Sequence, residues 1–164
     1  MTLTVQAFPG GTLATNTYLV ADSTSREAII VDAADGTLSA VSSALDQNNL
    51  VAKAIVLTHT HWDHVVDATA MRRTLQVPLH VNAFAQTLFG GPDAPIAIPE
   101  LPDIESFLPD RKLDEADEIT VGEYRFTVLF VPGHERAHIA LWCEAEDVLI
   151  SGDVIFPGGH GTTE

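Results

Sequence analysis

The stretch 57–64 (LTHTHWDH) constrains the fold of this chain most, because it places four metal-binding side chains between positions 59 and 64. The apolar, partly β-branched run 53–57 precedes it and predicts a buried strand. In residues 65–75, which follow, apolar positions recur at helical spacing. The sequence therefore predicts that this cluster lies where a strand passes into a helix, with its side chains converging at the edge of a sheet.

The spacing of these residues indicates metal binding. Alternate side chains of an extended segment share a face, so His59, His61 and Asp63 are expected to point the same way. His64 breaks the alternation, which fits a chain that turns into a helix. Two imidazoles can hold one metal ion, and a carboxylate with the next imidazole can begin a second site; these ligands suit zinc, iron or manganese. An incidental solvated cluster is the weaker alternative, because polar groups at the end of a buried strand are costly without a partner.

Composition narrows the class of protein. The 164 residues suffice for one domain, which we place at 1–164, and 46% of them are hydrophobic, which is typical of a globular chain. The net charge of -15 with only 8 Lys and Arg residues disfavours a nucleic-acid partner, although the same charge also simply aids solubility. The single cysteine, Cys143, excludes an internal disulfide and is interpreted as a packed side chain.

The sequence also bounds location and partners. The N-terminus lacks a basic region followed by a long apolar one, so no export signal is predicted. No apolar run approaches the length of a membrane span. We therefore expect a cytoplasmic protein that acts on a small-molecule substrate without a membrane partner, and the sequence leaves its oligomeric state open.

Several polar residues follow predicted strands. Asp32, His59, His134 and Asp153 each stand at or just beyond the end of an apolar run. Ligand-type residues at successive strand ends predict one functional edge of a sheet. The predicted strands are 3–7, 16–20, 28–31, 53–57, 77–81, 124–130, 138–142 and 148–150. The predicted helices are one that begins after a Thr37 cap, one at 65–75, one through Phe84 and Leu88, and a short one at 104–108 in a proline-rich loop at 90–110.

Taken together, these motifs resemble those of the metallo-β-lactamase superfamily. The matching elements are Asp32 after a strand, HTHWDH at 59–64, Pro-Gly-His at 132–134, and Gly152-Asp153 followed by Phe156. Within that superfamily, the chain is most similar to hydroxyacylglutathione hydrolase (glyoxalase II) and its bacterial relatives. The resemblance implies an α/β (α+β) fold, a four-layer αβ/βα sandwich with metals at one edge of its two sheets.

The resemblance further implies that six side chains hold two divalent metal ions, with three at the first ion, two at the second and one bridging both. The first ion would be held by His59, His61 and His134, and the second by Asp63 and His64, while Asp153 would bridge both. Asp32 and His138 would support these ligands without binding metal. Zinc is the metal we expect first, with iron or manganese as alternatives.

The resemblance places a further histidine ligand of the second metal in a segment beyond the one that ends here. We therefore expect a fragment whose sandwich is incomplete at the C-terminus, without a final strand, helices and that ligand. His160 could in principle substitute, but a glycine-flanked loop histidine is expected near the substrate mouth or in solvent. His80, within a predicted strand, is expected to have no role in the site.

The implied function is hydrolysis of a thioester by a hydroxide formed at the metals, with Asp63 orienting the hydroxide and taking its proton. A thiolate leaving group needs little acid assistance, because thiols ionise near pH 8.5. Two alternatives within the superfamily are a lactone or ester hydrolase and a one-iron sulfur dioxygenase. The alternative of another class is a non-catalytic, metal-binding fragment.

Overall fold

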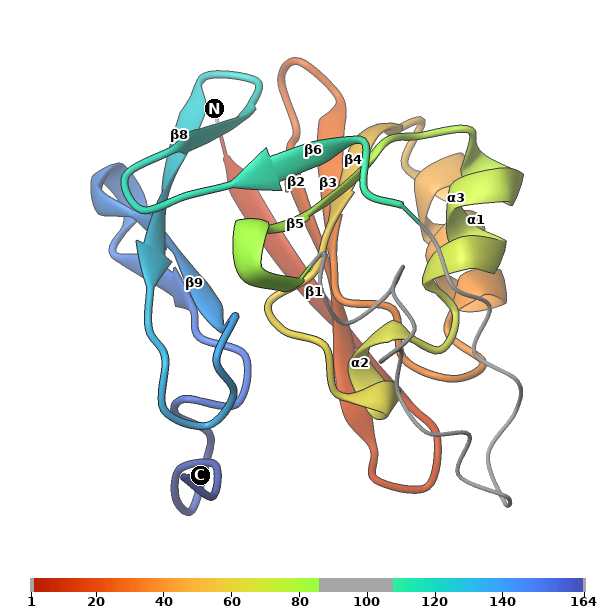
Figure 1. The fold of residues 1–164 in the computed structure, drawn as a ribbon. Helices are drawn as coiled ribbons and strands as arrows, with labels where there is room; N and C mark the ends of the chain where they lie inside the picture. Colours follow the sequence, from red (N-terminus) through yellow and green to blue (C-terminus); the bar gives the residue numbers. More distant parts are fainter. Residues whose placement is uncertain (1, 86–107, 164) are drawn as a thin grey trace.

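The computed structural model describes residues 2–85 and 108–163, and these form two facing β-sheets with helices against one outer face (Figure 1). The larger sheet has the order β1-β2-β3-β4-β5-β6 and the smaller one β10-β9-β8-β7. The mixed α/β class predicted from the sequence is therefore confirmed. The strands are β1 (Leu3–Gly10), β2 (Thr15–Asp22), β3 (Glu27–Val31), β4 (Val51–Val56), β5 (Leu79–Asn82), β6 (Arg111–Leu113), β7 (Glu118–Val121), β8 (Tyr124–Phe130), β9 (Ile139–Cys143) and β10 (Val148–Ile150).

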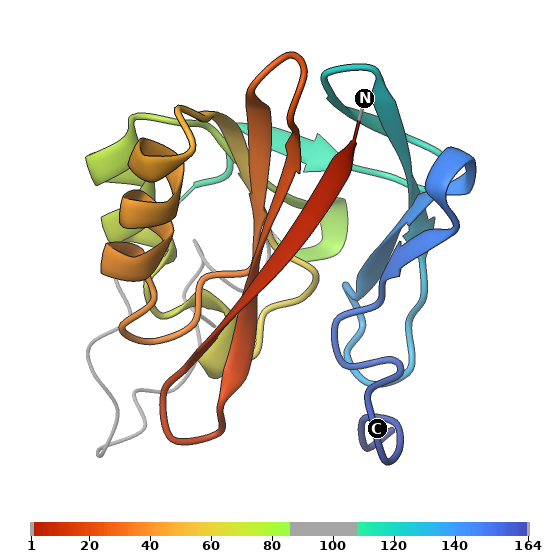
Figure 2. The ribbon, with the colours of Figure 1, turned by 180° about the vertical axis from the view of Figure 1, so that it is seen from behind.

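The helices lie against the outer face of the larger sheet (Figures 1 and 2). They are α1 (Leu38–Gln47), α2 (Trp62–Val65) and α3 (Ala68–Leu75). Two short 3-10 turns lie elsewhere: η1 (Ala83–Ala85) follows β5, and η2 (Glu144–Glu146) joins β9 to β10 of the smaller sheet. Within 2–85 and 108–163 no α-helix covers the outer face of the smaller sheet, and on strand β10 Leu149 is 45% exposed. None of the helices in this described part of the chain is both long enough and apolar enough to cross a bilayer.

Strand β3 shows why the centre of the molecule is apolar on every side. Ile30 packs in a core shared with the helices, whereas Ile29 and Val31 pack in a second core between the two sheets. Because alternate side chains point to opposite faces, a strand covered on both faces is an unbroken apolar run rather than an alternating one. Strand β4 has the same pattern. Because both strands are buried on both faces, the residues that directly follow them have fixed positions at one edge of the sheet.

The helix predicted at 65–75 is wrong at its start, since the chain forms two helices there. Ala33 breaks the run: its N–H donates to the carbonyl of His64 at 2.8 Å, and its carbonyl accepts from the N–H of Asp67 at 3.0 Å. These bonds to another segment replace the continuation of a single helix. The interruption brings the turn after β3, with Asp32, against His64.

Other differences from the predicted elements are local. Strand β1 runs beyond the predicted 3–7 to include Pro9 and Gly10, which a proline tolerates on an edge strand. Thr37 does precede α1, but its hydroxyl donates to the carbonyl of Ala34 instead of capping the helix. Strands β6 and β7 were not predicted. The helix expected through Phe84 and Leu88 is a 3-10 turn as far as Ala85, and the remainder, the helix at 104–108 and most of the loop at 90–110 lie outside the described residues.

Candidate metal centre

The polar residues predicted at strand ends come from four segments that meet at one edge of the two sheets. His59 and His61 lie between β4 and α2, while Asp63 and His64 lie on α2 itself. His134 comes from the loop between β8 and β9, and Asp153 follows β10. A backbone hydrogen bond of 2.8 Å from Ile139 N–H to the carbonyl of Thr58 joins the two sheets beside this edge.

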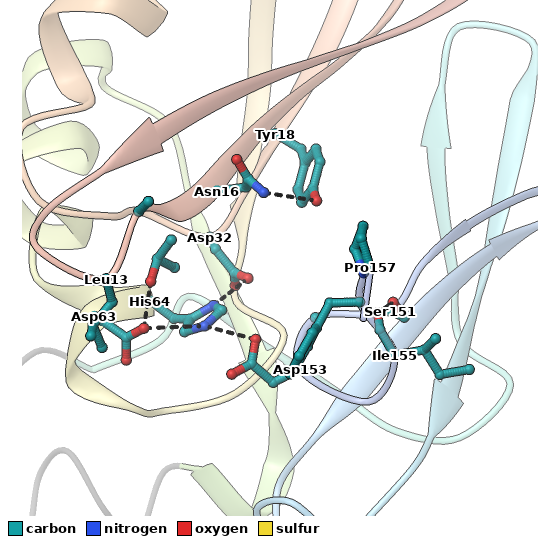
Figure 3. Close-up of a pocket in the computed structure, with 14 residues that line it drawn as sticks. Leu13, Asn16, Tyr18, Asp32, Asp63, His64, Ser151, Asp153, Ile155 and Pro157 are labelled. Atoms are coloured by element: carbon teal, nitrogen blue, oxygen red, sulfur yellow. Dashed lines mark hydrogen bonds and ion pairs between the residues drawn. The ribbon is translucent and has the colours of Figure 1, made fainter. Parts of the chain in front are cut away.

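Two groups of three side chains each offer ligand atoms within 4.8 Å of one another. The first group, the imidazole trio, is His59, His61 and His134. The second contains His59, His64 and Asp153. Asp63 adjoins the second group, since its Oδ2 lies 3.6 Å from His64 Nε2 (Figure 3). The structure thus brings together all six residues that the resemblance implies as ligands.

Asp32 fixes the ring orientation of His64 directly. His64 Nδ1–H donates to Asp32 Oδ2 at 2.8 Å, and both side chains are buried. Asp32 itself has φ of 61°, a left-handed conformation that Asp tolerates better than most residues. Because Nδ1 is engaged outward, Nε2 of His64 faces the cluster.

Asp32 also fixes His59 through Thr58. The Thr58 hydroxyl donates its single proton to Asp32 Oδ2 at 2.8 Å, since a carboxylate can only accept. The hydroxyl oxygen, 3.0 Å from His59 Nδ1, therefore accepts the ring N–H. His59 Nε2 is left with a free lone pair, which points toward His61 Nδ1 at 3.1 Å.

His134 is oriented by backbone. Its Nδ1–H donates to the carbonyl of Thr162 at 2.7 Å, so Nε2 faces the cluster. The adjacent Gly161 packs on the ring so closely that an added Cβ would lie 2.6 Å from His134 Nδ1. The segment after β10 thus returns to hold a residue from the loop between β8 and β9.

Asp153 lies between the two groups. Its Oδ1 is 3.2 Å from His64 Nε2, and its Oδ2 is 3.5 Å from His134 Nε2. His138, which is fully buried, accepts the backbone N–H of Asp153 at Nε2 over 3.2 Å and stacks on His59. Gly152, at φ of 51°, has room for no side chain, because a Cβ would lie 2.7 Å from His138. His138 thus supports the backbone of Asp153 and does not point a nitrogen into the cluster.

The two groups differ in charge. Burial, reinforced by neighbouring imidazoles, lowers the pKa of His59, and burial with His134 lowers the pKa of His61. Burial alone would also lower the pKa of His64, but Asp32, Asp153 and Asp63 outweigh it and raise that pKa to about 10. The charged His64 imidazole, 3.2 Å away, lowers the pKa of Asp153. Without metal, His59 and His61 are therefore expected to be neutral while His64 carries a proton.

These contacts fit a metal centre. His64 Nε2 and His134 Nε2 are buried and lack a hydrogen-bond partner among the described residues, although carboxylate oxygens of Asp153 lie close to both. An unpartnered buried nitrogen is costly, and a metal ion held jointly with the carboxylate would satisfy it. Imidazole and carboxylate together form the ligand set of zinc and similar ions.

Sequence reasoning missed the partners that hold the ligands. Thr15 donates its hydroxyl proton to Asp63 Oδ2 at 2.5 Å, and Thr60 donates to Glu135 at 3.3 Å. Neither pair carries a recognisable spacing, since the partners are 48 and 75 residues apart in the chain. The only available signal was the adjacency of Thr58 and Thr60 to the ligand histidines in the motif at 57–64.

Three other candidates lie apart from the cluster. His80 is half-buried on β5 and belongs to neither group; that it has no role in the site stays a prediction. His160 is exposed and its Nδ1 contacts the carbonyl of Gly161, so it joins neither group. Cys143 is buried in the core between the sheets, which confirms its packing role.

A pocket of about 380 Å³ opens beside the second group (Figure 3). Asp32, Asp63, His64 and Asp153 line its inner part. Residues from the turn between β1 and β2 and from the segment after β10 form its outer part. A small molecule in this pocket would therefore lie against the ligands of the second group.

Comparison with solved structures supports the same fold. BLEG-1 B3 metallo-beta-lactamase superposes with a TM-score of 0.85 and 29% identity, over 98% of this chain and 77% of that one. TTHA1623, in a di-iron-bound form, superposes with a TM-score of 0.79 and 28% identity, over 95% of this chain and 75% of that one.

Comparison of sequences leads to the same family. A hydroxyacylglutathione hydrolase of Bdellovibrio bacteriovorus is 32% identical over 88% of this chain, which spans 50% of that protein's length. The family model of the metallo-beta-lactamase superfamily matches residues 10–164. The chain therefore belongs to the metallo-beta-lactamase superfamily.

Proposed function

We propose that this chain hydrolyses a thioester with the help of two divalent metal ions. The observation that carries the proposal is the convergence of the imidazole trio with His64 and Asp153, all within a few ångströms at one sheet edge. Members of the superfamily are metal-dependent hydrolases, and relatives near 31% identity are named hydroxyacylglutathione hydrolases. The thioester substrate is inferred from those relatives together with the chemistry of the site.

We assign the imidazole trio to one metal ion, Asp63 and His64 to the other, and Asp153 to both. When bound, such ions lower the pKa of water from 15.7 to about 7 and polarise a carbonyl oxygen. The protein contributes the orientation of the ligands. Asp32 accepts the outward Nδ1–H of His64, and it holds the Thr58 hydroxyl that accepts the Nδ1–H of His59. The Thr162 carbonyl accepts the Nδ1–H of His134. The ligand nitrogens are therefore directed before metal binds.

Asp63 is the residue we assign to proton transfer. It lies on the pocket wall, and the hydroxyl of Thr15 donates to its Oδ2. That bond leaves Oδ1 available to orient an attacking water and to accept its proton. A thiolate leaving group needs no proton donor, because thiols ionise near pH 8.5.

The test compares turnover and metal content in the same preparations. The whole chain, loaded with zinc, iron or manganese, is assayed for thiol release from an S-acyl thioester and for hydrolysis of the matching oxoester and lactone. We expect the thioester to be preferred and the His61→Ala variant to lose more than about 100-fold in kcat/KM, since even the outer partners of metal ligands are typically worth 10–100-fold. His160→Ala, outside both groups, is the matched control and should keep full activity.

Two outcomes would overturn the proposal. Chain that binds no metal, as measured by elemental analysis, would exclude a metal-dependent reaction. Metal-loaded chain that cleaves the oxoester or lactone while sparing the thioester would assign the site to another bond.

A further inference from the structure

The pocket beside the second group has apolar outer walls that come from two distant segments. One wall is Leu13 and Ala14, in the turn between β1 and β2. The other is Ile155, Phe156 and Pro157, after β10. Leu13 and Ile155 are 63% and 62% exposed, so both present apolar surface to whatever enters the pocket (Figure 3).

Hydrogen bonds, rather than core packing, hold the wall after β10 in place. Phe156 and Gly159 exchange two bonds of 3.1 and 3.0 Å, and the Ser151 hydroxyl donates to the carbonyl of Ile155 at 2.8 Å. Gly161 N–H donates to the carbonyl of Asp153 at 2.8 Å, which ties the same segment to the second group. The wall is therefore ordered relative to the ligands, and its exposed apolar side chains are available for a substrate to bury.

No described residue that lines the pocket is a lysine or an arginine, whereas Asp32, Asp63 and Asp153 all line it. Arg136 lies near His134 in the chain but is exposed and does not line the pocket. Other cations are paired with carboxylates elsewhere: Lys53 with Glu27, Arg72 with Asp110, Arg111 with Asp117, and Arg125 with Glu118. Thr15, Asn16, Tyr18 and Ser151 also line the pocket, but none of them is a cation. A carboxylate on the outer part of a substrate would thus find no cation there, in a protein of net charge -15.

We infer that the part of the substrate seated between these walls is apolar and uncharged, so that the site prefers thioesters with an apolar thiol arm over those with an anionic one. This inference rests on the proposed function and adds a substrate class to it. The arm would pack between Leu13 and Ile155, while the carbonyl carbon lies at the ligand cluster. An anionic carrier would lose its hydration there without gaining a cation.

The test uses two propanoyl thioesters that differ only at the end of the thiol arm, one made with butanethiol and one with 3-mercaptopropanoate. The arms match in length and in the carbons next to sulfur. We expect kcat/KM of the metal-loaded chain to be at least about 10-fold higher for the butanethiol ester, the order of difference that one or two buried methylene groups provide in a hydrophobic pocket. Equal values, or faster cleavage of the anionic ester, would overturn the inference.

Two variants of Ile155 show whether the wall sets this preference. Ile155→Lys places a cation on the wall and should raise kcat/KM for the anionic ester until the preference is lost. Ile155→Gln is the matched control, because it is polar and similar in length but uncharged; it should slow the butanethiol ester without accelerating the anionic one. An unchanged ratio in Ile155→Lys would show that the arm does not contact this wall.

A measurement of binding without turnover distinguishes failure of this inference from failure of the proposed function. Thioethers with the same two arms cannot be hydrolysed, and their stabilisation of the metal-loaded chain against heat reports binding alone. Tighter binding of the apolar thioether supports the apolar pocket even if no thioester is turned over, in which case only the proposed function fails. Turnover of a methyl thioester with equal binding of both thioethers would instead reject the pocket and keep the function.

Discussion

The two ligand groups share one sheet edge but differ in how they meet a metal ion. In the imidazole trio, burial lowers the pKa values of His59 and His61, so both of these side chains are neutral at ordinary pH. In the second group His64 faces the carboxylates of Asp32, Asp153 and Asp63, which together outweigh burial and raise its pKa to about 10. The trio is therefore ready to bind metal, whereas the second group must first lose a proton.

This difference has a common origin in Asp32. It accepts the N–H of His64 directly, which stabilises the charged imidazole, but reaches His59 only through the neutral hydroxyl of Thr58. The buried carboxylate of Asp32 thus orients both His59 and His64, but it stabilises the charged form of His64 alone. The same separation lets the two groups be tested independently.

The largest expected effect is on the pH dependence of metal binding. Below its pKa of about 10, His64 binds a proton that a metal ion must displace, so affinity of the second group should rise about 10-fold per pH unit between pH 7 and 9. Metal binding by His59 and His61 should change little over that range, because their lowered pKa values leave both imidazoles unprotonated. Titration of metal-free chain with zinc against a competing chelator should resolve a pH-dependent and a nearly pH-independent step. Two steps with the same pH dependence would contradict the assigned difference.

Much of this centre could be predicted from the sequence, and the reason is physical. His59 after β4 and Asp153 after β10 can be recognised in the sequence as candidate ligands. Each comes just after an apolar run that predicts a strand, and few other residue types bind metal. The fold class and the family were confirmed, and the predicted ligands do lie together; their metal-binding roles stay predictions.

The remainder could not be predicted, because it depends on tertiary contacts. The carbonyl that orients His134 belongs to Thr162, and every residue carries a carbonyl, so no side-chain pattern marks it. The break between α2 and α3 comes from Ala33, a residue 31 positions before His64, whose backbone bonds compete with the helix. Strands β6 and β7 are short and carry charged residues, and pairing with neighbours rather than their own pattern defines them.

Asp32→Asn should weaken both groups together. The amide keeps the size of the side chain but cannot accept from both His64 and Thr58 with the strength of a carboxylate. We expect metal affinity to fall 10–100-fold in each step, in line with the usual effect of removing an outer partner. Calorimetric zinc titration checks this, and a loss confined to one step would show that Asp32 serves only that group. Asp35→Asn, in the same turn, is the control, since Asp35 lies in neither group.

Thr58→Val should weaken metal binding by the imidazole trio more than metal binding by His64 and its carboxylate neighbours. Valine removes the hydroxyl that accepts the His59 N–H but keeps the shape of the side chain, and His64 keeps its own bond to Asp32. We expect the trio to lose about 10-fold in zinc affinity, at the low end for an outer partner, while the pH-dependent step changes much less. Thr58→Ser restores the hydroxyl and should recover the affinity. Equal weakening of both steps would indicate that Thr58 acts through the general packing of this edge.

The smallest effect is expected at Thr15, the first residue of β2, whose hydroxyl donates to Asp63. Thr15→Val removes one hydrogen bond to a charged acceptor at nearly constant volume, and such bonds are worth about 1.5–3 kcal/mol. Because Asp63 is partly solvent-exposed and water can replace the hydroxyl, we expect a loss of only several-fold, mainly in kcat, with the imidazole trio unaffected. Thr15→Ser should retain the wild-type rate. If kcat is unchanged while KM rises, Thr15 contributes to the pocket wall rather than to the orientation of Asp63.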